Sequence, residues 1–145
     1  MSGYSWVPSS FGRALPPNAV QGGRDSDGSI IYVGKTRYMG DELPCKVIPQ
    51  KRAAYVSHNC REHQVSSFEV LCQQTLRWVR NSGGYIPPGA VPGGRTNTGE
   101  TLYIGRVHHG GSETVGKVHP SHGCLYIPYG GNEVSYKQYD ILVLQ

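Results

Sequence analysis

PPNAVQGGRDSDGSIIYVGK at residues 16–35 and PPGAVPGGRTNTGETLYIGR at residues 87–106 are two versions of one sequence. Extended without a gap, residues 16–71 align with residues 87–142, and 18 of the 56 aligned pairs are identical. Chance would give about four identities at ordinary residue frequencies. One inserted residue upstream places Trp6 over Trp78. The sequence therefore predicts two tandem copies of one unit, residues 1–71 and 72–145.

Each copy is built from short runs of β-branched and aromatic residues separated by Gly, Pro, Asp and Asn. Such runs are typical of strands, and apolar residues nowhere recur at helical spacing over about ten residues. The runs expected as strands in the first copy are the segment around Trp6, SIIYVGK, CKVIP, AAYVS and FEVLC. We expect an all-β fold in which two pseudo-symmetric repeats of short antiparallel strands form one compact unit.

Turn residues separate these runs. The sequence Asp25-Ser26-Asp27-Gly28 offers side-chain acceptors to its own backbone and a glycine for positive φ, which predicts a tight turn. The second copy has Thr96-Asn97-Thr98-Gly99, which keeps the turn and lacks both carboxylates. Proline pairs at residues 16–17 and 87–88 are expected in loops or at sheet edges, since proline cannot continue a central ladder.

Composition and charge exclude several classes of protein. With 37% hydrophobic residues, 20 Gly and 10 Pro in 145 residues, the chain suits one compact core rather than a disordered tail. The net charge of +4 comes from scattered residues, so we expect no nucleic-acid partner. No apolar stretch suits membrane insertion, and the first residues lack the features of a signal peptide. The expected location is cytoplasmic, or outside the cell after release without a signal peptide.

Cysteine and histidine spacing indicates neither a metal site nor a cofactor. The four cysteines form no C-x-x-C pair, and reduced thiols are expected: Cys45, Cys60, Cys72 and Cys124. The grouping most like a metal site is Cys60 with His58 and His63, while His119 and His122 lack the i, i+4 spacing of helical zinc ligands. Serine-elbow, P-loop and H-E-x-x-H motifs are absent, so we expect no enzyme.

Several motifs recur in both copies in the same order: a Trp, then P-x-x-A-V-x-G-G, then G-x-x-(I/L)-Y-(V/I)-G-(K/R), then G-x-x-x-x-x-K-V. This pattern resembles the DM-nine repeat, a family that includes the N-terminal modules of natterin-like proteins and mannose-binding lectins of molluscs and flatworms. The resemblance covers nearly the whole chain. It implies an all-β protein, commonly a homodimer, that recognises mannose-type glycans on microbes and lacks enzymatic activity.

The resemblance also implies a sugar site. In the mollusc lectins the sugar is held by an acid in the turn after the Gly-Gly segment and by the Lys of a Pro-Gly-Lys-like segment. Carried onto this sequence, these are Asp25 and Lys46, with Glu42 as a candidate neighbour. The first copy departs from the family at Cys45, where a Gly usually precedes the Lys, and at residues 58–60, where the second copy has Tyr-Gly-Gly.

Residue chemistry alone supports the same pair more weakly. Sugar hydroxyls both donate and accept, so a carboxylate such as Asp25 and an ammonium such as Lys46 suit them. In the alternative interpretation, Asp25 only caps its turn and the lysine serves the fold by pairing with Glu62. Tyr38 has no tyrosine counterpart in the other copy and is a further candidate for sugar contact. The second copy predicts a weaker site, composed of Thr96, Lys117 and Glu113.

The leading hypothesis is a lectin that recognises mannose-type glycans on microbial surfaces in innate immunity. A non-enzymatic intracellular scaffold or protein-interaction module is the alternative, in which the duplicated surface binds another protein. A third class would use the +4 charge to dock on phosphates of a nucleic acid or a membrane.

Overall fold

The computed structural model describes residues 3–73 and 75–145, and within them fourteen strands form one sheet. The first repeat contains β1 (Tyr4–Ser10), β2 (Gln21–Arg24), β3 (Ile30–Tyr38), β4 (Asp41–Ile48), the 3-10 helix η1 (Pro49–Lys51), β5 (Ala53–His58), β6 (Arg61–Val65) and β7 (Ser67–Gln73). The second contains β8 (Leu76–Ser82), β9 (Pro92–Arg95), β10 (Thr101–His109), β11 (Ser112–His119), η2 (Pro120–His122), β12 (Cys124–Tyr129), β13 (Asn132–Tyr136) and β14 (Gln138–Leu144).

The all-β prediction is confirmed, and the two repeats contain the same strands at matching positions. All of the runs expected as strands form strands. Two strands in each repeat were not predicted. β2 and β9 are four-residue strands with two glycines, and β6 and β13 are largely polar, so neither pair has the apolar alternation that marks a strand in a sequence.

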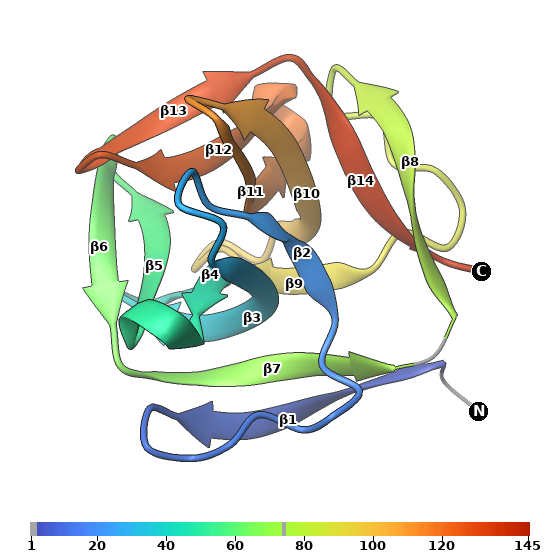
Figure 1. Ribbon diagram of the computed structural model, residues 1–145. Coiled ribbons are helices and arrows are strands. Elements are labelled where there is room, and N and C mark those ends of the chain that lie inside the picture. The colour runs from blue at the N-terminus through green and yellow to red at the C-terminus, as the bar shows by residue number, and fades with distance from the viewer. Residues whose placement is uncertain (1–2, 74) are drawn as a thin grey trace.

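The order of strands in the sheet shows the pseudo-symmetry directly. It runs β1-β7-β3-β4-β5-β6-β13-β12-β11-β10-β14-β8, which meets the same elements from either end, and β6 pairs with β13 at the centre. Figure 1 shows the blue-to-green first repeat and the yellow-to-red second repeat closing around each other, with both chain ends on one side. The centre of the sheet is therefore the junction of the repeats.

Paired glycines let the repeats approach closely. A side chain at Gly23 would place its Cβ 2.0 Å from the carbonyl oxygen of Glu113, and one at Gly94 would lie 2.0 Å from that of Glu42. Real Cβ atoms cannot come so near to another atom. Glycine is therefore required at Gly23 and Gly94 for each segment to lie against the other repeat. The core behind this contact mixes both repeats: Ile31, Val33, Ile48, Leu71, Val91, Ile104, Val115 and Leu142.

The expected turns are present. The amide of Gly28 donates to the carbonyl of Asp25 at 2.9 Å, and that of Gly99 donates to the carbonyl of Thr96 at the same distance. Both proline pairs lie outside the strands. The β2–β3 and β9–β10 turns thus place their side chains next to the junction of the repeats.

Backbone conformation separates the two repeats. Within the described residues, four non-glycine positions have positive φ, all in the first repeat: Met39 (50°), Arg52 (48°), Asn59 (51°) and Cys60 (67°). Their counterparts are glycines that also have positive φ: Gly110, Gly123, Gly130 and Gly131. Left-handed backbone costs an ordinary L-residue about 1–2 kcal/mol. The first repeat therefore has side chains at four left-handed positions where glycine is sufficient for the fold, as the second repeat shows.

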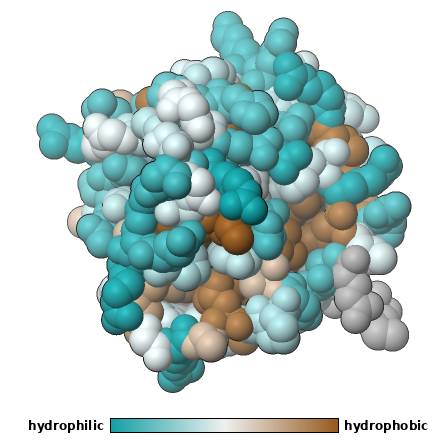
Figure 2. Space-filling view, in the orientation of Figure 1, coloured by the Kyte–Doolittle hydropathy of each residue, from teal (hydrophilic) through white to brown (hydrophobic). Residues whose placement is uncertain are grey.

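The surface is mainly hydrophilic in the orientation of Figure 2, with hydrophobic atoms in a central recess and along the lower and right-hand parts of that face. Neither helix in the described residues is long or apolar enough to cross a membrane. Residues 3–73 and 75–145 hold no group of three or more acidic, histidine or cysteine side chains suited to a metal ion. The four cysteines are free, and only Cys60 is exposed.

Candidate functional site

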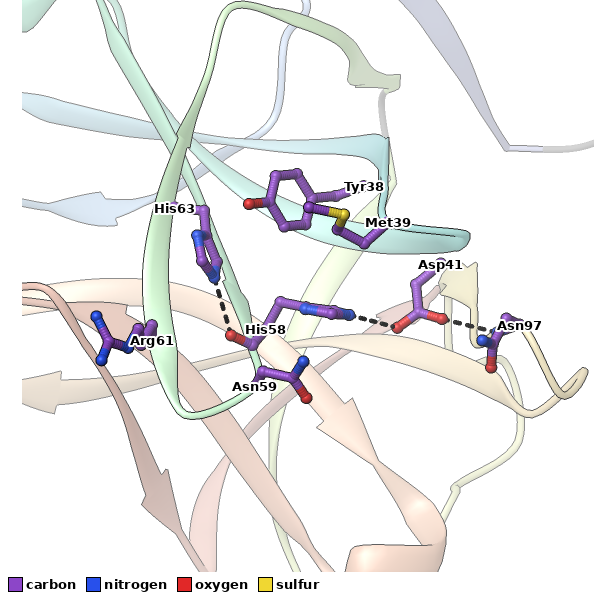
Figure 3. A pocket seen from close by; sticks show the side chains of 8 residues that line it. All are labelled: Tyr38, Met39, Asp41, His58, Asn59, Arg61, His63 and Asn97. Carbon is purple, nitrogen blue, oxygen red and sulfur yellow. Dashed lines mark hydrogen bonds and ion pairs between the residues drawn. The ribbon is translucent and has the colours of Figure 1, made fainter.

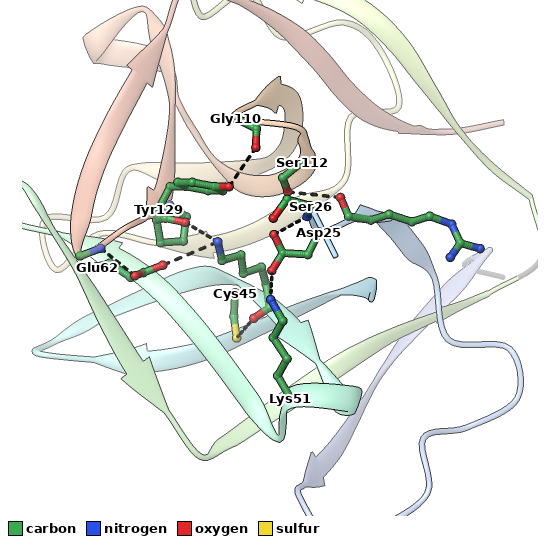
Figure 4. Close-up of polar contacts among 12 residues, drawn as sticks. Asp25, Ser26, Cys45, Lys51, Glu62, Gly110, Ser112 and Tyr129 are labelled. Carbon is green, nitrogen blue, oxygen red and sulfur yellow. Dashed lines mark hydrogen bonds and ion pairs between the residues drawn. The ribbon is translucent and has the colours of Figure 1, made fainter. Parts of the chain in front are cut away.

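A cleft of about 230 Å³ opens at the junction of the repeats. The β2–β3 turn, β4, η1, β5 and β6 of the first repeat and the β12–β13 turn of the second form its walls. Figure 4 shows the side chains that meet there. The lining residues are Asp25, Ser26, Lys46, Ile48, Lys51, Tyr55, Glu62, Tyr129 and Gly130.

Lys46 lies at the base of this cleft with a side chain only 4% exposed. Its Nζ donates to the carbonyl of Pro128 at 2.6 Å and lies 3.6 Å from Glu62 Oε2. The rings of Tyr129 and Tyr55 lie 4.9 and 5.5 Å from the same nitrogen. Burial lowers the pKa of Lys46, and the charge of Glu62 partly offsets that effect. Lys46 is thus a fixed donor, surrounded by acceptors and ring faces.

Asp25 lies at the rim and is held on both oxygens. Oδ1 accepts from the amide of Ser26 at 2.9 Å, and Oδ2 accepts from Lys51 Nζ. Lys51 also lies 3.4 Å from Asp27 Oδ2. Burial raises the pKa of Asp25, but the hydrogen bonds from Lys51 and Ser26 outweigh it, so the pKa lies below the usual range. Asp25 is therefore a charged, oriented acceptor at neutral pH.

The second repeat supplies the far wall. Glu62 Oε1 accepts from the amide of Gly131 at 2.9 Å, and the hydroxyl of Tyr129 donates to the carbonyl of Gly110 at 3.3 Å. The hairpin tip between β12 and β13 is thereby fastened over Lys46. The cleft exists only where the two repeats meet.

Of the four residues expected in the first site, the structure brings two together. Asp25 and Lys46 line the cleft. Glu42 lies four residues before Lys46 on the same strand, and residues four apart on a strand are about 13 Å apart. Glu42 therefore does not reach the cleft and pairs with Lys35 at 3.7 Å. Tyr38 stacks on His63, with ring centroids 4.7 Å apart, in a separate groove.

Seven of the nine lining residues were not among the expected site residues, and the side chains of three of them make hydrogen bonds: Lys51, Glu62 and Tyr129. Glu62 was expected only as a fold partner of Lys46, and that ion pair is present. Its retention in both copies together with the lysine was a usable signal, since the pair recurs as Lys117 and Glu133. Lys51 and Tyr129 gave no such signal, because the equivalent positions hold His122 and His58.

The corresponding place in the second repeat, called here the second site, keeps the same lysine–glutamate base. Lys117 Nζ donates to the carbonyl of Ser57 at 2.9 Å and lies 3.1 Å from Glu133 Oε2. Glu133 Oε1 accepts from the amide of Cys60 at 3.0 Å, as Glu62 does from Gly131. Glu113, the third residue expected here, lies elsewhere and pairs with Arg106 at 3.6 Å.

The rim of the second site differs from the rim of the first cleft. Thr96, in place of Asp25, lies 3.0 Å from Thr98 through the two hydroxyls. A carboxylate is nevertheless present, because Glu100 accepts from the amide and hydroxyl of Ser121 at 2.8 and 2.7 Å. The turn of the second copy thus lacks a carboxylate, as the sequence shows, and Glu100 supplies one beside it.

Histidines replace the other rim residues of the first cleft. His119 and His122 stand in place of Ile48 and Lys51, with ring centroids 3.6 Å apart. His119 Nε2 lies 3.0 Å from Glu100 Oε1. Burial and the neighbouring His122 lower the pKa of His119, against the effect of Glu100. Protein groups therefore already engage the second rim.

These features define an all-β protein of two tandem repeats that interlock, with a cleft at one of two related lysine–glutamate pairs. The sequence matches the DM9 repeat over residues 1–41 and 25–136, and the chain belongs to this family. Natterin-4 of Thalassophryne nattereri is 27% identical over 148 residues, which cover 97% of this chain and 34% of that protein. Natterin-3 of the same species is 32% identical over 87 residues, which cover 57% of this chain and 21% of that protein. The chain thus spans about a third or less of the length of these relatives.

A solved structure shares the fold. The nematode sperm cell motility protein MFP2B superposes with a TM-score of 0.72 at 14% identity, covering 98% of this chain and 47% of that one. At this identity the likeness concerns the fold alone. Membership of the DM9 repeat family and the similarity to natterins fit a lectin-like or carbohydrate-binding module.

Proposed function

We propose that this chain is a non-enzymatic lectin that binds a mannose-type hexose in the cleft of its first repeat. The observation that carries the proposal is the placement of the Asp25 carboxylate and the Lys46 ammonium in one cleft with two tyrosine rings. Each Asp25 oxygen keeps a lone pair for a sugar hydroxyl, and Lys46 keeps a proton for a hydroxyl oxygen. Charge-assisted hydrogen bonds of this kind are the stronger ones.

The size of the cleft supports a single sugar ring. Its volume of about 230 Å³ is smaller than the roughly 300–1,000 Å³ typical of sites for drug-sized ligands. A small polar site of this kind gives weak binding. We expect a dissociation constant of hundreds of micromolar to millimolar, about 4–5 kcal/mol.

Weak single sites need multivalency to hold a cell surface, and we propose a homodimer for this purpose. Linked sites raise apparent affinity by roughly 10²–10⁴ without new contacts, and twofold dimers are the commonest oligomers. The edge strands β1 and β8 offer surfaces for such pairing. The proposed role is recognition of microbial surfaces in innate immunity.

A glycan array and calorimetry with mannose test the proposal. Asp25→Asn and Lys46→Met should each abolish retention of mannose-type glycans. Asp27→Asn is the matched control, because Asp27 shares the turn and the contact with Lys51 but does not line the cleft. Wild-type binding by both site variants would refute the site. Failure of the wild type to retain any glycan would favour the protein-interaction alternative.

Assembly has its own test. Light scattering at micromolar concentration should give twice the 15.9 kDa mass of the chain, together with agglutination of mannose-bearing cells. A monomer that agglutinates nothing would remove the avidity mechanism.

A further inference from the structure

A larger groove of about 640 Å³ lies apart from the cleft of Asp25 and Lys46 and shares no lining residue with it. It runs between two hairpin tips of the first repeat, β3–β4 and β5–β6, and the β9–β10 turn of the second repeat closes it. Figure 3 shows its lining side chains. They are Tyr38, Met39, Asp41, His58, Asn59, Arg61, His63 and Asn97.

One part of the groove is a fixed wall. The ring of Tyr38 stacks on His63, and His63 Nε2 lies 3.0 Å from the carbonyl oxygen of His58. His58 Nε2 lies 3.3 Å from Asp41 Oδ2, while Asp41 Oδ1 accepts from the backbone N–H of Asn97 at 2.7 Å. Figure 3 shows this chain of contacts from one hairpin to the other. Both oxygens of the only carboxylate in the lining are thus engaged by the protein.

The remaining polar side chains are available donors. Within residues 3–73 and 75–145, the side chains of Asn59, Arg61 and Asn97 make no hydrogen bond or ion pair, although all three line the groove. A guanidinium offers five N–H donors and each amide offers two. A groove with free donors, in which the protein already engages both carboxylate oxygens, is complementary to a ligand rich in acceptors. An anion satisfies a guanidinium best.

The groove is a feature of one repeat only. The counterparts of Asp41, Arg61 and His63 in the second repeat are Ser112, Asn132 and Val134. Met39 and Asn59 occupy left-handed positions where the second repeat has Gly110 and Gly130. The same hairpins therefore fold without these side chains. Backbone strain of this kind concentrates at functional positions.

We propose that this groove binds an anionic saccharide. The carboxylate or phosphate of the sugar accepts from Arg61, the amides of Asn59 and Asn97 donate to its oxygens, and the ring lies against Tyr38 and Met39. Met39 is 72% exposed and supplies an apolar contact for the carbon face of a sugar. The volume is ample for a sugar ring and too large for a lone oxyanion.

Calorimetry on the full chain with glucuronic acid, mannose 6-phosphate, mannose and inorganic phosphate tests the proposal. We expect at least one of the two acidic sugars to bind at least tenfold more tightly than inorganic phosphate, and the comparison between them tells a carboxylate from a phosphate ligand. This binding should persist in Asp25→Asn, the variant that removes the rim acid of the other cleft. Loss in Asp25→Asn would place the acidic sugar in the first cleft and overturn the proposal. Inorganic phosphate binding as tightly as both sugars would also overturn it.

Variants taken from the second repeat test the residues. Arg61→Asn/His63→Val should weaken the acidic sugar at least tenfold, with mannose binding unchanged. Asn59→Gly removes a strained side chain, so it should keep or raise the melting temperature while it weakens the acidic sugar. Lower affinity at undiminished stability is not the signature of a purely structural residue. Unchanged affinity in both variants would overturn the assignment.

Discussion

The cleft of the first repeat and the corresponding site of the second repeat have the same lysine–glutamate base and differ at the rim. Lys46 with Glu62 and Lys117 with Glu133 make equivalent ion pairs, and each lysine donates to a carbonyl of the opposite repeat. At the rim, Asp25 bonds to a lysine of η1, whereas Glu100 bonds to Ser121 of η2. The comparison indicates that the lysine–glutamate base stabilises the fold, whereas the rim residues determine which ligand is bound.

The base is retained because it satisfies backbone groups at the junction. Glu62 accepts the amide of Gly131, and Glu133 accepts that of Cys60. Each glutamate therefore fastens the hairpin tip of the other repeat. The carbonyls of Pro128 and Ser57, which accept from Lys46 and Lys117, are buried at the junction. A buried acceptor without a donor costs about 1–3 kcal/mol, which explains why the lysine–glutamate pair persists while the rim changes.

The largest effect that we expect follows from breaking one base. Glu62→Gln leaves Lys46 buried without a counter-charge, a kind of change that costs about 3–5 kcal/mol. The midpoint of urea unfolding should fall accordingly. Glu133→Gln should produce a similar loss at the second site if the two bases are equivalent.

The double variant Lys46→Met/Glu62→Leu is the control for this experiment. Replacing both members of a buried ion pair with apolar residues is often neutral or stabilising, so the double variant should lose less stability than Glu62→Gln. The loss that remains reports the Pro128 carbonyl and the Gly131 amide left without partners. A loss below about 1 kcal/mol in Glu62→Gln would show that the pair is solvated and contradict its structural role.

The next effect concerns the rims. Thr96→Asp/His122→Lys gives the second rim the acid and the base of the first rim, and calorimetry should then show mannose bound at two sites per chain rather than one. A hydrogen bond to a charged group contributes about 1.5–3 kcal/mol, which corresponds to roughly a tenfold or greater gain at the second site. Thr96→Asp alone is the control, because its new carboxylate would face the imidazole of His122 instead of an ammonium. Two equal sites in the wild type would contradict the comparison.

The contrast between base and rim also explains how far the sequence could predict the molecule. The duplication, the strands with apolar alternation and the turn at Asp25 follow from local chemistry, so they are visible in the sequence. β2 and β6 have no such pattern and form because the neighbouring strands pair with them. The resemblance supplied Asp25 and Lys46, since both belong to short motifs.

The rest of the site depends on contacts between distant segments. Tyr129 reaches the first cleft only because β6 pairs with β13, 71 residues away. Glu42 was expected beside Lys46 because the two are close in sequence. On an extended strand, however, residues four apart lie far from each other. Glu100 compensates for Thr96 from the start of the next strand, a position that the alignment pairs with Ser29.

A smaller effect should separate the rims by their response to pH. The lowered pKa of His119 means that the folded chain takes up this proton less readily than the unfolded chain. Its contribution to stability is therefore complete above the ordinary histidine pKa of about 6.5 and is lost as the pH falls through the lower folded value. His119→Ile, which installs the residue of the first rim, should reduce the drop in melting temperature between about pH 8 and pH 5.

The remaining histidines are common to the wild type and the variant, so the difference between their pH profiles reports His119 together with its interaction with His122. Parallel profiles would show that His119 titrates normally. Ile48→His in the first cleft is the reverse test and should add a drop in the same pH range.

The smallest effect concerns the strained backbone of the first repeat. Cys60→Gly and Arg52→Gly install the glycines of the second repeat at positive φ. Relief of about 1–2 kcal/mol of strain is partly offset by the extra freedom of glycine in the unfolded chain, about 0.4–1 kcal/mol. We expect a net gain of about 0.5–1 kcal/mol for each, measured by urea unfolding. Gly131→Ala, which should lose stability, is the matched control.

The exchange of hairpin tips bears on how such a chain could have originated. One repeat carries one lysine–glutamate base and one tip, so two identical chains on a twofold axis would complete two identical clefts. After gene fusion the axis survives only in the backbone, and a mutation alters one cleft without its copy. An ancestral pair of equal sites can then diverge into two specificities, while the shared junction keeps both halves folded.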